Sequence, residues 1–157
     1  MTSLWLHALF LGDIFCDMSA GGGAVRVPET HRSLLESTVD VVLTTVGVDG
    51  YPHSSMVWCS YDGGNVLLNT GRGYAKERNM RRNPRVSVFA CDLGRWVEVQ
   101  GDVELVEEGA VEHLNQLCLR YTGKPDFYRD LMPELAGREM RVIVRVTPMR
   151  VRCGDVT

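Results

Sequence analysis

The sequence predicts a mainly β protein of the α+β class, a small antiparallel barrel of six strands with short helices inserted. Short runs of β-branched and other apolar residues recur along the chain, and Asp-Gly turns at Asp49-Gly50 and Asp62-Gly63 join neighbouring runs into hairpins. Only Gly109–Tyr121 shows the helical period over a long stretch. At 157 residues, the chain is long enough for one domain and too short for two ordinary ones.

The first expected helix, Glu29–Ser37, follows Pro28 and places Leu34 and Leu35 on its buried side. The six expected strands are Val39–Val46, Pro52–Ser60, Asn65–Thr70, Arg85–Cys91, Trp96–Val106 and Met140–Val146. The fifth of them alternates apolar and polar residues cleanly except at Gly101, where we expect a bulge or a close backbone approach.

Between the last two strands the pattern becomes helical. Apolar residues recur at i, i+3, i+4 and i+7 over Gly109–Tyr121, and Phe127–Met132 is expected to add another helical turn or two. His31 and His113 lie on predicted helices without metal-ligand spacing, so we expect both to face solvent. The five cysteines are far apart and contain no CxxC pair. This spacing argues against a zinc site and a disulfide framework, and indicates a reducing, cytoplasmic setting.

Residues 1–24 are expected to lie outside the folded domain, which then covers residues 25–157. The apolar run Leu4–Leu11 follows no Lys or Arg, is too short to cross a bilayer, and lacks the basic region of a signal peptide. Met18 opens a stretch that is typical of a protein start. Our hypothesis is that residues 1–17 precede the true start or form a disordered tail; an amphipathic anchor is the alternative. We expect no membrane partner.

The segment Gly71–Arg85 holds six of the seventeen Lys and Arg residues and one acid, in a chain of net charge −3. It follows a strand-like run, and Pro84 ends it. A glycine turn into a short basic helix presents backbone N–H groups, a helix dipole and cationic side chains together, which is typical of a phosphate site. The alternative is a solvated charged helix. A pI near 5.8 argues against a nucleic-acid partner.

The chain contains no serine-hydrolase elbow, zinc-protease motif, P-loop or complete dinucleotide fingerprint. We therefore nominate no metal ligand, and the catalytic residues stay unknown. An enzyme without these groups commonly takes its chemistry from a cofactor. A flavin-like cofactor needs a cationic grip on its phosphate, for which Lys76, Arg78 and the backbone N–H groups of Gly71–Tyr74 are candidates. The stretch Ser55–Trp58 is a candidate slot for its ring.

The order of motifs from Val39 to Val106 resembles the pyridoxamine 5'-phosphate oxidase-like split β-barrel family of flavin and deazaflavin oxidoreductases. The motifs are the hairpin VGVDGYPHSSMVW, the strand end LLNTGRG, the helix AKERNMRRNPRVSV, the strand RWVEVQGDVEL and the tail strand MRVIVRVTPMRV. The resemblance implies an FMN-binding-like split barrel, a homodimer with the cofactor at its interface, and a small-molecule substrate.

The resemblance also implies which residues contact the cofactor. Ser55, Met56 and Val57 would lie along the ring, Asn69 and Thr70 by its polar edge, Lys76 at the phosphate, and Trp96 where the partner chain often contributes. Tyr74 and Arg78 complete the set of expected contacts.

The Ala-Lys-x-Arg-Asn pattern at 75–79 is similar to the branch of the family that binds the deazaflavin coenzyme F420. This implies hydride transfer to a small conjugated or aromatic substrate. An FMN-dependent oxidoreductase of the same fold, or a non-catalytic protein that binds flavin, F420 or haem, remains the alternative. Ser55 and Ala75 stand where true pyridoxamine-phosphate oxidases have an arginine, so vitamin B6 oxidation is not expected.

Overall fold

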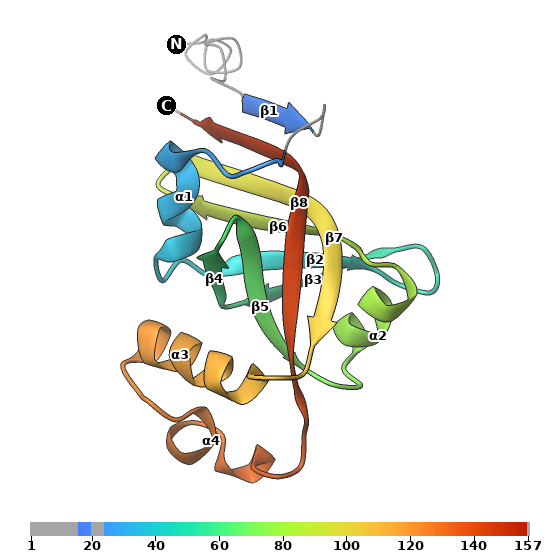
Figure 1. The fold of residues 1–157 in the computed structure, drawn as a ribbon, viewed down its shortest axis with the longest axis vertical. Helices are drawn as coiled ribbons and strands as arrows, with labels where there is room; N and C mark the ends of the chain where they lie inside the picture. Colours follow the sequence, from blue (N-terminus) through green and yellow to red (C-terminus); the bar gives the residue numbers. More distant parts are fainter. Residues whose placement is uncertain (1–15, 20–23, 157) are drawn as a thin grey trace, which may run out of the picture.

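The computed structural model describes residues 16–19 and 24–156. In this part of the chain the strands form one antiparallel sheet in the order β3-β2-β6-β7-β8-β5-β4, with β1 paired to β8 (Figure 1). The strands are β1 (Cys16–Ser19), β2 (Val41–Val46), β3 (Pro52–Val57), β4 (Cys59–Asp62), β5 (Asn65–Gly71), β6 (Arg85–Asp92), β7 (Arg95–Val106) and β8 (Arg141–Asp155). The helices are α1 (Glu29–Glu36), α2 (Ala75–Arg82), α3 (Ala110–Thr122), α4 (Phe127–Asp130) and the 3-10 turn η1 (Pro133–Leu135).

The predicted split-barrel, α+β fold is confirmed, but the described residues form eight strands instead of six. The predicted strand Pro52–Ser60 is two strands, because the chain leaves the sheet at Trp58 and stacks its indole on Tyr121 with ring centroids 5.2 Å apart. Strand β3 then pairs with β2, and β4 pairs with β5. These two pairs are the opposite ends of the strand order, so this short connection curls the sheet on itself.

The other added strand is β1, whose four residues pair with the C-terminal part of β8. Residues 1–15 and 20–23, most of the segment expected to precede the domain, lie outside the described residues. The expected domain boundary after residue 24 therefore stays a prediction. Strand β8 itself runs past its predicted end at Val146 to Asp155, because it keeps pairing with β7 beyond the register shift at Gln100/Gly101.

That register shift confirms the irregularity expected at Gly101. A Cβ built on Gly101 would collide with the backbone carbonyl oxygen of Thr147 on β8, so only glycine lets the two strands approach this closely. Strands β7 and β8 run the length of the molecule in Figure 1. They connect the end of the sheet beside α1 with the end that carries α3 and α4.

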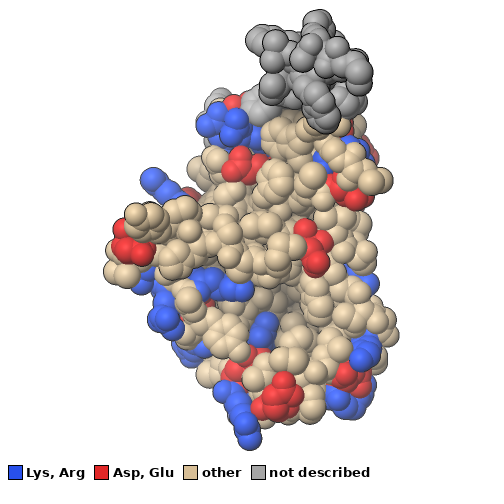
Figure 2. Space-filling model, turned by 180° about the vertical axis from the view of Figure 1, so that it is seen from behind, with Lys and Arg blue, Asp and Glu red and all other residues tan. Residues whose placement is uncertain are grey.

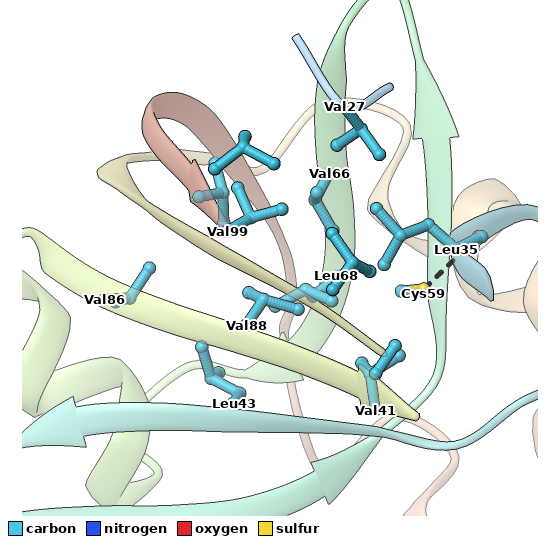
Figure 3. Close-up of a cluster of buried hydrophobic side chains, with 14 of the residues drawn as sticks. Val27, Leu35, Val41, Leu43, Cys59, Val66, Leu68, Val86, Val88 and Val99 are labelled. Carbon is cyan, nitrogen blue, oxygen red and sulfur yellow. Dashed lines mark hydrogen bonds between the residues drawn. The ribbon is translucent and has the colours of Figure 1, made fainter. Parts of the chain in front are cut away.

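Inward-facing valines dominate the interior (Figure 3). Alternate residues of the strands point inward, so Val41, Val88 and Val97 are each 0% exposed. Helix α1 covers one end of this interior with Leu35, whose backbone oxygen accepts a hydrogen bond of 3.3 Å from the Cys59 thiol. Among the described residues no helix is long and apolar enough to cross a membrane.

Candidate functional site

A cavity of about 290 Å³ lies where β5 and β8 meet α2, α3 and α4. Its lining residues are Asp40, Met56, Val57, Trp58, Asn69, Thr70, Tyr74, Lys76, Leu114, Leu117, Phe127 and Arg141. Six of the nine expected cofactor contacts are among them, namely Met56, Val57, Asn69, Thr70, Tyr74 and Lys76. Residues predicted from three separate motifs are thus brought to one cavity.

The other three expected contacts, Ser55, Arg78 and Trp96, are not among the cavity-lining residues. Ser55 is the register partner of Leu43 in the β2–β3 pair. Arg78 is exposed and donates a hydrogen bond to the backbone oxygen of Gly73. Trp96 stacks on Phe89 with ring centroids 6.2 Å apart. The cofactor roles of these three residues stay predictions.

The glycine turn before α2 is formed as expected, but its backbone donors are occupied. Gly73 has φ 82°, a conformation that favours glycine, and its N–H donates to Glu77 Oε2 at 3.0 Å. The N–H of Arg72 donates to a backbone oxygen at 2.8 Å, and that of Tyr74 to another at 3.3 Å. Three of the backbone donors that were candidates for an anion grip are therefore already hydrogen-bonded within the protein.

The cations of the basic segment also differ from one another. Four arginines are engaged inside the protein, Arg72 with Glu107, Arg78 with Gly73, Arg81 with Glu77 and Arg82 with Asn79. Lys76 lines the cavity, and its ammonium has no hydrogen-bond or ion-pair partner in the described part of the chain. Burial lowers the pKa of Lys76, and the nearby positive charge of Arg141 lowers it further. Lys76 is thus the cation of the basic segment that is available to a ligand in the cavity.

Sequence reasoning missed the carboxylate that organises one side of the cavity. Glu139 accepts hydrogen bonds from Tyr74 Oη at 2.6 Å, from Tyr128 Oη at 3.0 Å and from Arg141 Nη1 at 2.9 Å. Burial acts to raise the pKa of Glu139, but the Tyr74 hydrogen bond and the charge of Arg141 outweigh it, so the pKa is lowered overall. The hydrogen bond to Glu139 raises the pKa of Tyr74, and burial raises that of Tyr128 to about 12.

His113 does not face solvent as expected. It is 7% exposed, and its ring lies between Ser60 Oγ, 3.0 Å from Nε2, and Asn69 Nδ2, 3.3 Å from Nδ1. Burial and then the charge of Arg120 lower the pKa of His113 to about 4. The neutral ring therefore accepts from Asn69 and donates to Ser60, which helps to fix the Asn69 amide at the cavity wall. His31 is also 7% exposed, with Nε2 3.7 Å from an oxygen of Asp155.

Aromatic side chains form another wall. Trp58, the last residue of the candidate slot Ser55–Trp58, lines the cavity, and Phe127 of α4 meets it edge to face with ring centroids 6.4 Å apart. Phe127 was expected only as part of a helical turn. Among residues 16–19 and 24–156, no group of three or more His, Cys, Asp or Glu side chains is placed to hold a metal. The cavity therefore combines an aromatic wall with a cation that is unpaired among the described residues, which suits a ring-bearing anion.

Comparison with solved structures finds relatives of the same fold. An F420 reductase is 31% identical, with a TM-score of 0.67 over 80% of this chain and 98% of that chain. A conserved hypothetical protein of Mycobacterium tuberculosis is 30% identical, with a TM-score of 0.66 over 86% of this chain and 88% of that one. General stress protein 26 of Bacillus anthracis, at 20% identity and a TM-score of 0.56 over 78% of this chain and 89% of its own, shows the fold alone.

A comparison with curated proteins finds no match. Residues 27–153 match the family described as pyridoxamine 5'-phosphate oxidase, which covers most of the chain and nearly all of its described sheet. The chain therefore belongs to the pyridoxamine 5'-phosphate oxidase family, which includes flavin and deazaflavin oxidoreductases.

Proposed function

We propose that this chain is an F420-dependent oxidoreductase that acts on a small conjugated or aromatic substrate. The observation that carries the proposal is Lys76, a half-buried ammonium with no partner in the described residues, set in a cavity with an aromatic wall. An unpaired cation in a partly dry site favours an anionic ligand. The coenzyme supplies hydride chemistry when it is bound, and the residues of the cavity bind and orient it.

The residues present fit a phosphate-bearing, ring-bearing coenzyme. Thr70 lines the cavity, is 3% exposed, and its hydroxyl has no hydrogen-bond partner among the residues that the structure describes. A buried hydroxyl without a partner is unfavourable, so a polar ring edge would satisfy it. The likeness to an F420 reductase at 31% identity and the Ala75-Lys76 pattern both support F420 over FMN.

FMN remains the second candidate, and one observation favours it. Coenzyme F420 carries a polyglutamate tail, which basic side chains beyond the phosphate could follow. However, Arg78, Arg81 and Arg82 each have a partner within the protein, so each would have to give up that contact to bind such a tail. FMN has a phosphate and no such tail, so it needs fewer cations beyond Lys76 than F420 does.

We also propose that the working form is a cytoplasmic homodimer whose second copy closes the cavity. A volume of about 290 Å³ is at the low end for a ligand site, and Met56 on its wall is 62% exposed. Figure 2 shows one face of the molecule, on which acidic and basic side chains are interspersed around a central area that carries few of either. All five cysteines are free thiols, which supports a reducing compartment.

Titration of the purified protein with F420 and with FMN, followed by fluorescence, tests the proposal. Tighter binding of F420, together with turnover of reduced F420 on a panel of conjugated substrates, is expected. Tighter binding of FMN would favour the second candidate, and binding without any turnover would indicate a carrier. Sedimentation at the same concentrations shows whether the protein is a dimer.

Lys76→Ala is expected to lower the affinity for the preferred coenzyme at least several-fold, because the variant loses the unpaired cation. Arg85→Ala is the matched control, since Arg85 is an exposed cation of the same segment that does not line this cavity. Unchanged affinity in Lys76→Ala would contradict the assignment of the phosphate to this residue.

A further inference from the structure

We infer that Arg141 is a second ligand-binding cation of the cavity, which takes an acceptor group other than the phosphate, and that Glu139 is its positioning residue. The identity of the ligand rests on the proposed function, whereas the arrangement of the two side chains does not. Arg141 opens β8 and lines the cavity, and its side chain is 9% exposed.

Two partners and one ring hold the guanidinium in place. Nε donates to Asn69 Oδ1 at 2.8 Å, and Nη1 donates to Glu139 Oε1 at 2.9 Å. The guanidinium carbon lies 5.7 Å from the centroid of the Phe127 ring. Nη2 has no acceptor among the described residues. A planar fork that is fixed on two sides thus keeps one end free for a ligand.

The two partners of Arg141 are themselves fixed. Asn69 Nδ2 donates to the backbone oxygen of Ala110 at 2.8 Å and lies 3.3 Å from His113 Nδ1, so the amide oxygen is the atom turned to Arg141. Glu139 is held by the hydroxyl groups of Tyr74 and Tyr128. Because these bonds exist without a ligand, Arg141 is preorganised and need not be ordered on binding.

The free end is a charged, planar N–H donor, and the register shows which residues share its face of the sheet. In the β5–β8 register Gly71 pairs with Arg141 and Asn69 with Ile143, so Asn69 shares a face with Arg141, whereas Thr70, paired with Val142, projects from the opposite face. The Thr70 hydroxyl, which has no partner among the described residues, therefore reaches the cavity from another side. A cationic donor at the end of a fixed fork suits a carbonyl, enolate or carboxylate oxygen, whereas Lys76 at the start of α2 suits the phosphate.

Binding of coenzymes with and without a phosphate distinguishes the role of Arg141 from that of Lys76. The probes are F420 and its phosphate-free deazaflavin riboside, or FMN and riboflavin if FMN is preferred. Arg141→Gln is expected to weaken both members of the pair roughly tenfold, since a charge-assisted hydrogen bond is lost in each. Lys76→Ala is expected to weaken only the phosphate-bearing member. Arg138→Gln is the matched control, because Arg138 is exposed, does not line the cavity and undergoes the same change of charge.

The Nε–H resonance of Arg141, identified by its loss in Arg141→Gln, gives a readout that does not depend on stability. It is expected to shift when the phosphate-free probe binds. Glu139→Gln is expected to weaken that probe less than Arg141→Gln does, and to add nothing in the double variant, because it acts through Arg141. Arg141→Lys keeps the positive charge but loses the planar guanidinium, so we expect it to recover only part of the affinity. That partial recovery would show that the weaker binding of Arg141→Gln is not caused by misfolding.

The inference would be overturned if Arg141→Gln lost affinity only for the phosphate-bearing probe, or if it lost no affinity for either probe. Additive effects of Glu139→Gln and Arg141→Gln would overturn the positioning role. If the wild-type protein bound none of the four probes, the proposed function would fail instead. Titration of the wild-type protein and of Arg141→Gln with oxalate would then test the Arg141 inference separately. We expect the wild type to bind oxalate and Arg141→Gln not to bind it; equal binding by both would overturn the inference.

Discussion

The barrel interior and the cavity are built on the same strands, but they treat polar groups in opposite ways. In the interior, the buried Thr45 hydroxyl meets Asn79 Nδ2 at 3.0 Å, and the remaining volume is largely filled by valine and leucine. In the cavity, the Lys76 ammonium and the Thr70 hydroxyl have no partner in the described residues. The hydrogen bond between Thr45 and Asn79 contributes to the stability of the fold, whereas the unpaired cation and hydroxyl that share the cavity are where we expect a ligand to bind.

The largest expected effect comes from the interior. Leu35→Ala removes a side chain that is 0% exposed and leaves a space that β-strands cannot easily close, so we expect unfolding to become easier by about 2–5 kcal/mol. Urea denaturation measures this loss. Leu119→Ala is the control, because Leu119 on α3 is 54% exposed and its truncation is expected to cost little. If the interior and the cavity have separate roles, the folded fraction of Leu35→Ala is expected to bind coenzyme with the affinity of the wild type.

His113 lies at the border between the two regions and links stability to pH. The pKa of His113 is about 4 in the folded protein and 6.5 for an ordinary histidine, so between these values the unfolded chain binds more protons. Stability from this residue is therefore complete above pH 6.5 and is lost as the pH falls toward 4, by about 3 kcal/mol at most.

Denaturation of the wild type and His113→Gln across this pH range isolates the residue's share, since all other groups are common to both proteins. His113→Gln is expected to flatten the decline. An equally steep decline in His113→Gln would show that the ring is not buried in its neutral form.

The sequence predicted the interior better than it predicted the cavity, and the reason is physical. Alternation along β7 and the Asp-Gly turns are local patterns, so strand positions and the bulge at Gly101 could be read directly. The cavity depends on partners that are distant in the chain, such as Arg141 and Asn69, which are 72 residues apart. Nothing local to Arg141 distinguishes it from the other charged residues that alternate along β8.

The same limit explains the errors at His113 and Trp58. The amphipathic pattern of α3 shows which residues are apolar, but it does not show that Ser60 and Asn69 would cover His113. Strand-forming residues continue through Trp58, so only the change of pairing partner from β2 to β5 reveals the break. In contrast, Lys76 could be nominated because a cation after a glycine turn is a local signal.

The smallest expected effect is a gain of stability at Lys76. The lowered pKa of Lys76 means that its ionised form is less favourable in the folded protein than in the unfolded chain at neutral pH. Lys76→Met keeps most of the side chain's volume and removes the unpaired charge near Arg141, so the free energy of unfolding is expected to rise slightly while coenzyme affinity falls. Urea denaturation without coenzyme, set beside the coenzyme titration, measures both. A loss of stability in Lys76→Met would mean that the ammonium is satisfied in the free protein, and the contrast between a satisfied interior and an unsatisfied cavity would no longer hold at this residue.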